Sequence, residues 1–426
     1  MKICVVCLFI ALSMFMACGV LLNTTEKEGY CIVLSITGNS GGKGLLALQK
    51  TDKILVIDSL PFFSKGNLCF RGKKSLLPGQ YTYIQNGRRL FNFLISFEQR
   101  TDLHFIVSVE NGRTIQLVAQ GDRENSAYME FQRFIQNANR NPNISRTDVE
   151  KIDRYTDSIA KCYPNTLLEI IANNISKPPL PKHLALHDRR ILHTSILPIR
   201  LQSLFTNIVP AQLEYVIPQI DSILLLATDP LVKEWCGEFL LNYFLSSDIM
   251  GMENASVYIA KKYLAGEIKS NDAELLTEIA NYVSFNEHAL LGMTAPDLFL
   301  YNAEGQKISL LNLKADYTIL LFYDHECPLC REHIPEIESI YKQYQAKNIM
   351  VFAVYTQDRF EEWQRYVQTL NREWIHVWDP NFSSGFHRLY NVTGTPKIYL
   401  LDQNKTIIGR GVDAIVLKKI LSHYIN

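Results

Sequence analysis

The sequence predicts a multidomain protein with an N-terminal antiparallel β-sandwich or barrel, a central α-helical domain and a C-terminal layered α/β domain. Its 426 residues exceed the size of one ordinary domain. Residues 28–125 read as short β-strands and residues 126–288 carry helical periodicity. In residues 289–426, strands alternate with helices. These three patterns set the predicted domain boundaries.

The composition is that of a globular protein, because 47% of the residues are hydrophobic and 20% are charged. The formal net charge is zero, so neither nucleic acid nor an anionic membrane surface is expected as a partner. The sequence contains no Gly-rich phosphate-binding loop.

Residues 1–22 have the layout of a bacterial export signal. A lysine at position 2 precedes an apolar core at residues 3–16, and small residues follow. Cys18 after Ala17 resembles a lipobox, which predicts lipidation of Cys18; plain cleavage is the first alternative. The apolar run continues to Leu22, so an uncleaved membrane anchor is the second alternative. Each alternative places the protein in the periplasm or cell envelope.

Export changes how the scattered cysteines are interpreted, because disulfides persist in an oxidising compartment. Cys31, Cys69, Cys162 and Cys236 have no tight spacing. We expect buried or incidental thiols at these positions. A Cys31–Cys69 bridge is the alternative, and the sequence does not decide the pairing.

Residues 28–125 contain eight short runs rich in β-branched and aromatic residues, separated mostly by Gly, Asn or Asp as in antiparallel sheets. The runs are YCIVLSITG, GLLALQK, KILVIDSL, NLCFRGK, GQYTYIQ, LFNFLISF, DLHFIVSV and TIQLVAQG. They contain no constellation of catalytic groups, so we expect a structural or docking role.

Residues 126–288 carry helical patterns. In ENSAYMEFQRFIQNANR, the aromatic and aliphatic residues fall on one face at helical spacing. A Pro-rich break, KPPLPKH, precedes three or four further amphipathic helices. His183 and His187 lie four residues apart and His193 is near. We expect solvated or capping histidines there, with a metal site as the alternative.

The C-terminal residues alternate between strands and helices. A hairpin around Glu304 precedes a buried strand at residues 318–323, and Cys327 and Cys330 follow directly. The next segments read as helix REHIPEIESIYKQYQAK, strand IMVFAVYT, helix RFEEWQRYVQTLN and strand WIHVWD. A hairpin and the helix DAIVLKKILSHYI close the chain. Such alternation indicates an α/β sheet covered by helices.

The two cysteines fit a redox pair. Cys327 would lie at a helix N-terminus, where free N–H groups and the helix dipole favour a thiolate. Pro328 suits the first helical position because it has no N–H to leave unsatisfied. Cys330, one turn on, shares the face of Cys327, so it can attack a mixed disulfide from within the chain. Cys327 and Cys330 are therefore the candidate catalytic residues.

Residues 290–426 resemble a thioredoxin-like domain of the TlpA/redoxin class. The resemblance rests on the C-x-x-C pair after a buried strand, on Pro335 in the following helix, on Thr395-Pro396 before the next strand, and on the entry segment APDLFL. It implies a thioredoxin fold, thiol–disulfide oxidoreductase activity, and a cis-proline at Pro396. The cis-proline would present a backbone edge to substrate. The preceding regions resemble uncharacterised domains of exported Bacteroidetes thioredoxins.

Two positions depart from the usual thioredoxin pattern. Glu326 stands where thioredoxins carry tryptophan, and Leu321 stands where they carry a buried acid. Candidate replacements for that acid are Asp324, Glu326, Asp358 and Glu361.

The neighbours of Cys327 suggest a redox direction. Glu326 should oppose the Cys327 thiolate, whereas a protonated His325 would favour it. Together with Asp324, they are the candidate pKa-tuning residues. Weak thiolate stabilisation favours a reductant, and the resemblance also implies one. We therefore expect a reductant of disulfide-containing exported proteins, fed electrons by a membrane partner.

Two alternative functions compete with this prediction. Cys327, Cys330, His325 and His333 could together bind zinc or copper, and a degenerate domain could serve binding alone. Haem attachment is not expected, because Arg331 follows Cys330 where a histidine would be needed. We expect neither a metal nor a cofactor.

Overall fold

The computed structural model describes residues 29–38, 42–62, 67–99, 101–139, 145–176, 179–268 and 272–425. The chain divides into two compact units. The first comprises residues 1–178 and 190–199, and the second residues 179–189 and 200–426. The expected export signal and Cys18 lie outside the described residues. Within them, no helix has the length and apolar character that crossing a membrane requires.

The first unit contains two four-stranded sheets, with the strand orders β4-β1-β7-β8 and β3-β2-β5-β6. Their strands are β1 (Tyr30–Thr37), β2 (Gly42–Lys50), β3 (Lys53–Phe62), β4 (Asn67–Gly72), β5 (Gly79–Gln85), β6 (Arg88–Ile95), β7 (Thr101–Glu110) and β8 (Arg113–Gln120). Strands β1 and β7 pair in parallel, which the antiparallel prediction missed. The other pairs in both sheets are antiparallel.

One apolar cluster is shared by both sheets. Ile32 and Leu34 of β1 alternate with outward residues, as the two-residue period of a strand requires. Tyr81 and Phe93, on the adjacent strands β5 and β6 of the other sheet, join the same cluster with rings stacked at 5.5 Å between centroids. Each sheet therefore buries one face in this shared core and leaves the other face outside it. This arrangement agrees with the short strand-like runs seen in the sequence.

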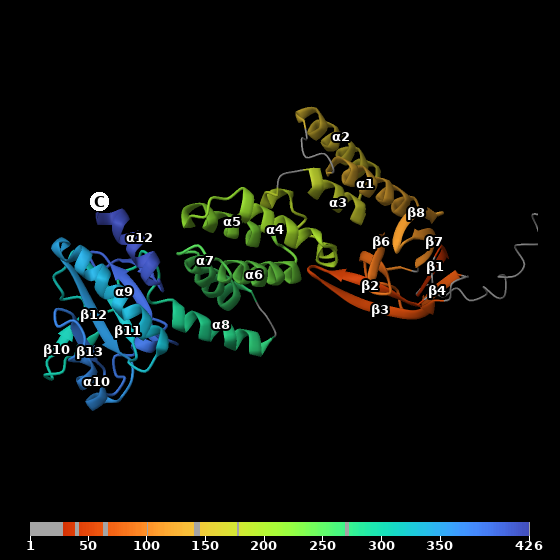
Figure 1. Cartoon of the computed structure of the whole chain (residues 1–426). Helices are drawn as coiled ribbons and strands as arrows, with labels where there is room; N and C mark the ends of the chain where they lie inside the picture. The colour runs from red at the N-terminus through yellow and green to blue at the C-terminus, as the bar shows by residue number, and fades with distance from the viewer. Residues whose placement is uncertain are drawn as a thin grey trace, which may run out of the picture. The chain divides into compact units, whose positions relative to one another are not determined.

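Helices follow the sheets (Figure 1). They are α1 (Arg123–Asn139), α2 (Arg146–Cys162), α3 (Leu167–Ser176), α4 (Ile196–Asn207), α5 (Leu213–Leu226), α6 (Pro230–Leu245), α7 (Glu253–Tyr258), the π-helix η3 (Ile259–Glu267) and α8 (Ala273–Asn286), with short 3-10 turns η1 (Pro181–His183) and η2 (Arg189–His193). The sequence-based boundaries at residues 125 and 288 fall inside the two units, so the helical residues are divided between them.

The C-terminal part of the second unit is a seven-stranded sheet with the order β10-β9-β13-β12-β11-β14-β15. Its strands are β9 (Phe299–Tyr301), β10 (Lys307–Ser309), β11 (Tyr317–Tyr323), β12 (Ile349–Tyr355), β13 (Ile375–Trp378), β14 (Lys397–Leu401) and β15 (Ile407–Arg410). Central strand β11 pairs in parallel with β12 and antiparallel with β14. This mixed sheet, with helices between its parallel strands, is the thioredoxin-like arrangement that the sequence predicts.

Helices cover both faces of this sheet (Figure 1). They are α9 (Pro328–Tyr344), α10 (Phe360–Val367), α11 (Phe386–Leu389) and α12 (Ala414–Ile425), with the 3-10 turn η4 (Gln345–Lys347). Leu321 of β11 faces a cluster that includes Ile334 of α9 and Leu417 of α12. Its neighbour Phe322 faces the opposite cluster with Phe386 of α11. The alternation fixes α9, and with it Cys330, against one face of β11.

Within the second unit, α7 and α8 also contact the C-terminal sheet. Glu253 Oε1 lies 3.3 Å from Arg410 Nη1, and the Arg410 side chain is only 7% exposed. Asn286 of α8 accepts a hydrogen bond from Arg410 at 3.0 Å and one from Asn391 at 2.9 Å. A buried guanidinium left without its carboxylate is costly, so these helices stabilise the sheet edge at β15.

Candidate active site

The two candidate catalytic cysteines, Cys327 and Cys330, lie at the junction between β11 and α9. The strand ends at Tyr323, and Cys327 is the N-cap residue of α9 with extended backbone angles. The Cys327 sulfur accepts a hydrogen bond from the Cys330 backbone N–H at 3.4 Å. Pro328 occupies the first helical turn, and Pro335 lies inside the helix. The sulfur thus takes the place of the side-chain oxygen that usually caps a helix.

The two sulfurs have different environments. Cys330 is fully buried in the cluster that contains Leu321, whereas Cys327 is half-buried and Leu329 between them is 55% exposed. A partner molecule can therefore approach Cys327 but not Cys330. This asymmetry is what a nucleophile and a resolving thiol require.

The loop before β14 lies against Cys327. The Thr395–Pro396 peptide bond is cis. The Cys327 thiol donates a hydrogen bond to the Thr395 carbonyl at 3.1 Å. Since β14 pairs with β11, the proline loop and the cysteine loop project from neighbouring strands at one end of the sheet. The structure thus joins Cys327 with Thr395 and Pro396, the residues that the sequence analysis singled out.

The pKa of the Cys327 thiol lies below its ordinary value, although its partial burial acts in the opposite direction. The lowering comes from hydrogen bonds donated by the Cys330 and Leu329 backbone N–H groups and by the Thr395 side chain. Burial, together with the contact and charge of Cys327, raises the pKa of Cys330 to about 12. At neutral pH the thiolate is therefore favoured at the accessible sulfur rather than at the buried one.

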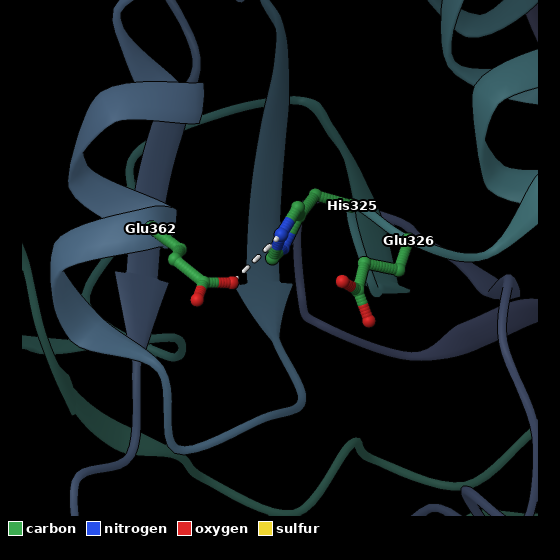
Figure 2. A group of neighbouring side chains, drawn as sticks. All are labelled: His325, Glu326 and Glu362. Atoms are coloured by element: carbon green, nitrogen blue, oxygen red, sulfur yellow. Dashed lines mark ion pairs between the residues drawn. The ribbon is translucent and has the colours of Figure 1, made fainter.

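A cluster of charged side chains flanks the pair. Arg359, which precedes α10, lies 2.6 Å from Glu326, 3.5 Å from Glu362 and 3.7 Å from Asp324, measured between guanidinium nitrogens and carboxylate oxygens. His325 Nε2 lies 3.4 Å from Glu362 Oε2, and the dashed line in Figure 2 marks this ion pair. We call these five residues the Arg359 cluster.

The Arg359 cluster alters the expected effect of Glu326. The Arg359 guanidinium holds the pKa of Glu326 below its usual value by hydrogen bond and charge. Glu326 is paired with Arg359 although its side chain is 61% exposed, so its negative charge opposes the Cys327 thiolate less than an unpaired carboxylate would. The cluster as a whole still has three carboxylates against one guanidinium, which leaves a net charge of −2 when His325 is neutral.

Leu321 has no acidic substitute in the core near Cys330. It is fully buried in the same apolar cluster as that cysteine. Among the described residues the one fully buried carboxylate is Asp379, which accepts hydrogen bonds from Ser383 and Ser384. Asp324 is half-buried and pairs with Arg359. Asp358 and Glu361 are exposed, so neither of them supplies a buried acid. Besides Cys327, the ionisable side chains whose charge would interact with Cys330 include Tyr323 and Tyr366.

The described residues do not assemble the metal site considered from the sequence. His333 Nδ1 lies 2.9 Å from Glu336 Oε2, on the exposed side of α9. Among the described His, Cys, Asp and Glu side chains, the one group of three with mutually close ligand atoms is His325, Glu326 and Glu362 (Figure 2). Arg359 already pairs with both of its carboxylates, and neither active-site cysteine belongs to it. His183, His187 and His193 form no such group in the described part of the chain.

Arg359 and Glu362 are site residues that the sequence analysis did not name. Arg359 is the N-cap residue of α10 and Glu362 lies in its first turn, more than 30 residues after Glu326. Their only sequence signal is an arginine followed three residues later by a glutamate at a helix start, which occurs in many surface helices.

Residues 291–410 match the AhpC/TSA family. The chain is 28% identical to the thioredoxin-like protein YneN of Bacillus subtilis over 161 residues, which cover 34% of this chain and 87% of that protein. It is 23% identical to the thiol-disulfide oxidoreductase ResA of Bacillus cereus over 127 residues, covering 30% of this chain and 72% of that protein.

Solved structures are also similar. A thioredoxin-like protein from Bacteroides caccae is 18% identical with a TM-score of 0.46, covering 60% of this chain and 94% of its own. A domain of a possible thiol-disulfide isomerase from Cytophaga hutchinsonii is 31% identical with a TM-score of 0.31, covering 33% of this chain and 96% of its own.

Proposed function

The C-terminal domain is a redoxin-class, thioredoxin-like domain of the thiol–disulfide oxidoreductase type, and from this premise we propose that the chain exchanges disulfides with exported proteins through Cys327 and Cys330. The observation that carries the proposal is the asymmetry of the pair. Cys327 is accessible, caps α9 and has a lowered pKa, while Cys330 is buried directly behind it with a raised pKa. The cis Thr395–Pro396 bond beside the accessible sulfur supports a peptide-binding edge there.

The reaction transfers two electrons and two protons. The Cys327 thiolate attacks one sulfur of a client disulfide, so the client S–S bond breaks and a mixed disulfide forms. The released client thiolate takes a proton. Cys330 then loses its proton, attacks Cys327 Sγ and frees the second client thiol. The products are a reduced client and a Cys327–Cys330 disulfide.

The contact between the two cysteines supports a pKa of Cys330 that changes between the stages of the reaction. While Cys327 is a thiolate, its charge raises the pKa of Cys330. Once Cys327 is held in a mixed disulfide, that charge is gone, so the pKa of Cys330 falls at the stage when its thiolate is needed. The two cysteines therefore act in sequence without a buried carboxylate.

We further propose the reducing direction, with electrons supplied by a membrane partner in the periplasm or cell envelope. A strongly stabilised thiolate makes an oxidant, and a weakly stabilised one makes a reductant. Hydrogen bonds from backbone N–H groups and Thr395 stabilise the Cys327 thiolate, but the adjacent Arg359 cluster has a net negative charge. Lipidation at Cys18 would hold the protein at the membrane.

Trapping experiments test the activity. The Cys330→Ser variant, produced in the envelope of a bacterial host, should accumulate mixed disulfides with client proteins that dithiothreitol releases. The matched control is Cys327→Ser/Cys330→Ser, which should trap no client through the thioredoxin-like site. If Cys330→Ser traps no more than this control and the parent reduces no disulfide substrate, the proposal fails.

A further inference from the structure

A second pair of cysteines lies in the first unit, on two adjacent antiparallel strands: Cys31 is in β1 and Cys69 is in β4. Ile32 and Leu34 of β1 face the core, and so do Leu68 and Phe70 of β4. Because side chains alternate along a strand, Cys31 and Cys69 lie together on the opposite face, where both are only partly buried. Both thiols keep partial solvent exposure and the neighbouring Arg71 is exposed, so small molecules can reach this face.

The register places the two sulfurs close to bonding distance. Cys31 is paired with Arg71, and Val33 is paired with Cys69, so the cysteines are diagonal neighbours across the two strands. Their Sγ atoms are 3.5 Å apart. A disulfide bond is about 2.05 Å long, so roughly 1.5 Å has to close. Diagonal neighbours lie about 7–8 Å apart across a strand pair, so closing this gap takes side-chain rotation together with a small backbone shift at the edge strand β4.

Arg71 supplies the charge that a thiol–disulfide site needs. Its Nε donates a hydrogen bond to the Cys69 sulfur at 3.0 Å. A neighbouring guanidinium favours a thiolate, which is the reacting form of cysteine. Cys31, by contrast, has its pKa raised by burial and by its contact with Cys69. Because the guanidinium contact falls on Cys69, we assign the attack to Cys69 and the resolving step to Cys31.

We propose that Cys31 and Cys69 form a second, reversible thiol–disulfide site in the N-terminal β region, oxidised by disulfides of small thiols such as glutathione. The Cys69 thiolate attacks the glutathione disulfide, one glutathione leaves as a thiol, and Cys69 carries the other. Cys31 then attacks Cys69 Sγ and releases the second glutathione. Two electrons and two protons pass from the cysteine pair to glutathione, and a Cys31–Cys69 bond forms. This site does not depend on the function proposed for Cys327 and Cys330.

The test uses the full chain with Cys327→Ser and Cys330→Ser, so the thioredoxin-like site cannot contribute. The protein is equilibrated with reduced and oxidised glutathione, free thiols are alkylated, and tryptic peptides are analysed by mass spectrometry. We expect residues 28–43 linked to residues 66–71 in protein that stays monomeric on a non-reducing gel, and loss of the link as reduced glutathione increases. Unlinked peptides under fully oxidising buffer, whether alkylated or carrying glutathione, would overturn the proposal.

Two control variants separate the pair from other thiols. Cys162→Ser, which removes an exposed cysteine elsewhere, should leave the linked peptide unchanged. Arg71→Gln should slow formation of the link roughly two- to five-fold, because a surface guanidinium stabilises the thiolate only modestly. Arg88→Gln, on another strand of the same unit, should not slow it. Equal rates in both arginine variants would contradict the activating role of Arg71.

Discussion

Thr395 offers a sharp test of how the site stabilises the Cys327 thiolate. Its side chain donates a hydrogen bond to that sulfur and lowers the pKa of Cys327. Thr395→Val keeps the branched shape and removes the donor. The test is made in the Cys330→Ser background, so that Cys327 is the only active-site thiol.

The magnitude follows from the exposure of Cys327. A hydrogen bond to a charged group contributes about 1.5–3 kcal/mol, and solvent screening at a half-buried sulfur reduces this to about 1 kcal/mol. A free-energy change of that size lowers the thiolate population at neutral pH about five-fold. A more basic thiolate is also more nucleophilic, which offsets nearly half of the loss on a logarithmic scale. The net fall in reaction rate is about two- to three-fold.

The assay is the rate of iodoacetamide alkylation of Cys327 from acid to alkaline pH. Thr395→Val should react about two- to three-fold more slowly at pH 7, with its whole profile displaced to higher pH. Thr395→Ser retains the hydroxyl and should follow the parent. If the valine and parent profiles coincide, the Thr395 hydroxyl does not stabilise the thiolate and the reasoning is refuted.

Two further predictions concern burial. In the reduced parent, Cys327 should be alkylated at least about 100-fold faster than Cys330 at pH 7, as peptide mass spectrometry will measure; comparable rates would contradict the resolving role of Cys330. Glu253→Gln should lower the free energy of unfolding of the second unit by about 1–3 kcal/mol, because it leaves the buried Arg410 without its carboxylate. Glu267→Gln, which removes an exposed ion pair, should change it by less than about 0.5 kcal/mol, and similar unfolding midpoints for the two variants would count against the Arg410 contact.

The sequence predicted most of what lies in local segments. The strand before Cys327, the helix after it and the proline before β14 each have a short signature, because caps, periodicity and turn residues act within a few positions. The eight strands of the first unit are also recognisable as separate runs. Their pairing is not, since β1 lies between β4 and β7, and the parallel match with β7 joins residues about 70 positions apart.

The features that the sequence did not predict are mostly contacts between side chains from distant segments. Glu326 looked like an unopposed negative charge beside Cys327, because Arg359 reaches it from the next crossover segment. Arg410 gave no sign that Glu253 would neutralise it from α7. The Cys31–Cys69 alternative depended on strand register, and a slip of one residue would turn either cysteine toward the core. Such contacts depend on tertiary packing, so no local sequence pattern predicts them.

The most direct test of the central claim is the redox equilibrium of Cys327 and Cys330. The protein is equilibrated with glutathione buffers of graded potential, and the two thiols are quantified by alkylation and peptide mass spectrometry. We predict conversion of both cysteines into one Cys327–Cys330 disulfide, in a single two-electron transition well below the −120 mV of a dedicated periplasmic oxidant. A transition near about −120 mV would contradict the reducing direction. If both thiols stay unlinked throughout, the pair does not perform thiol–disulfide exchange.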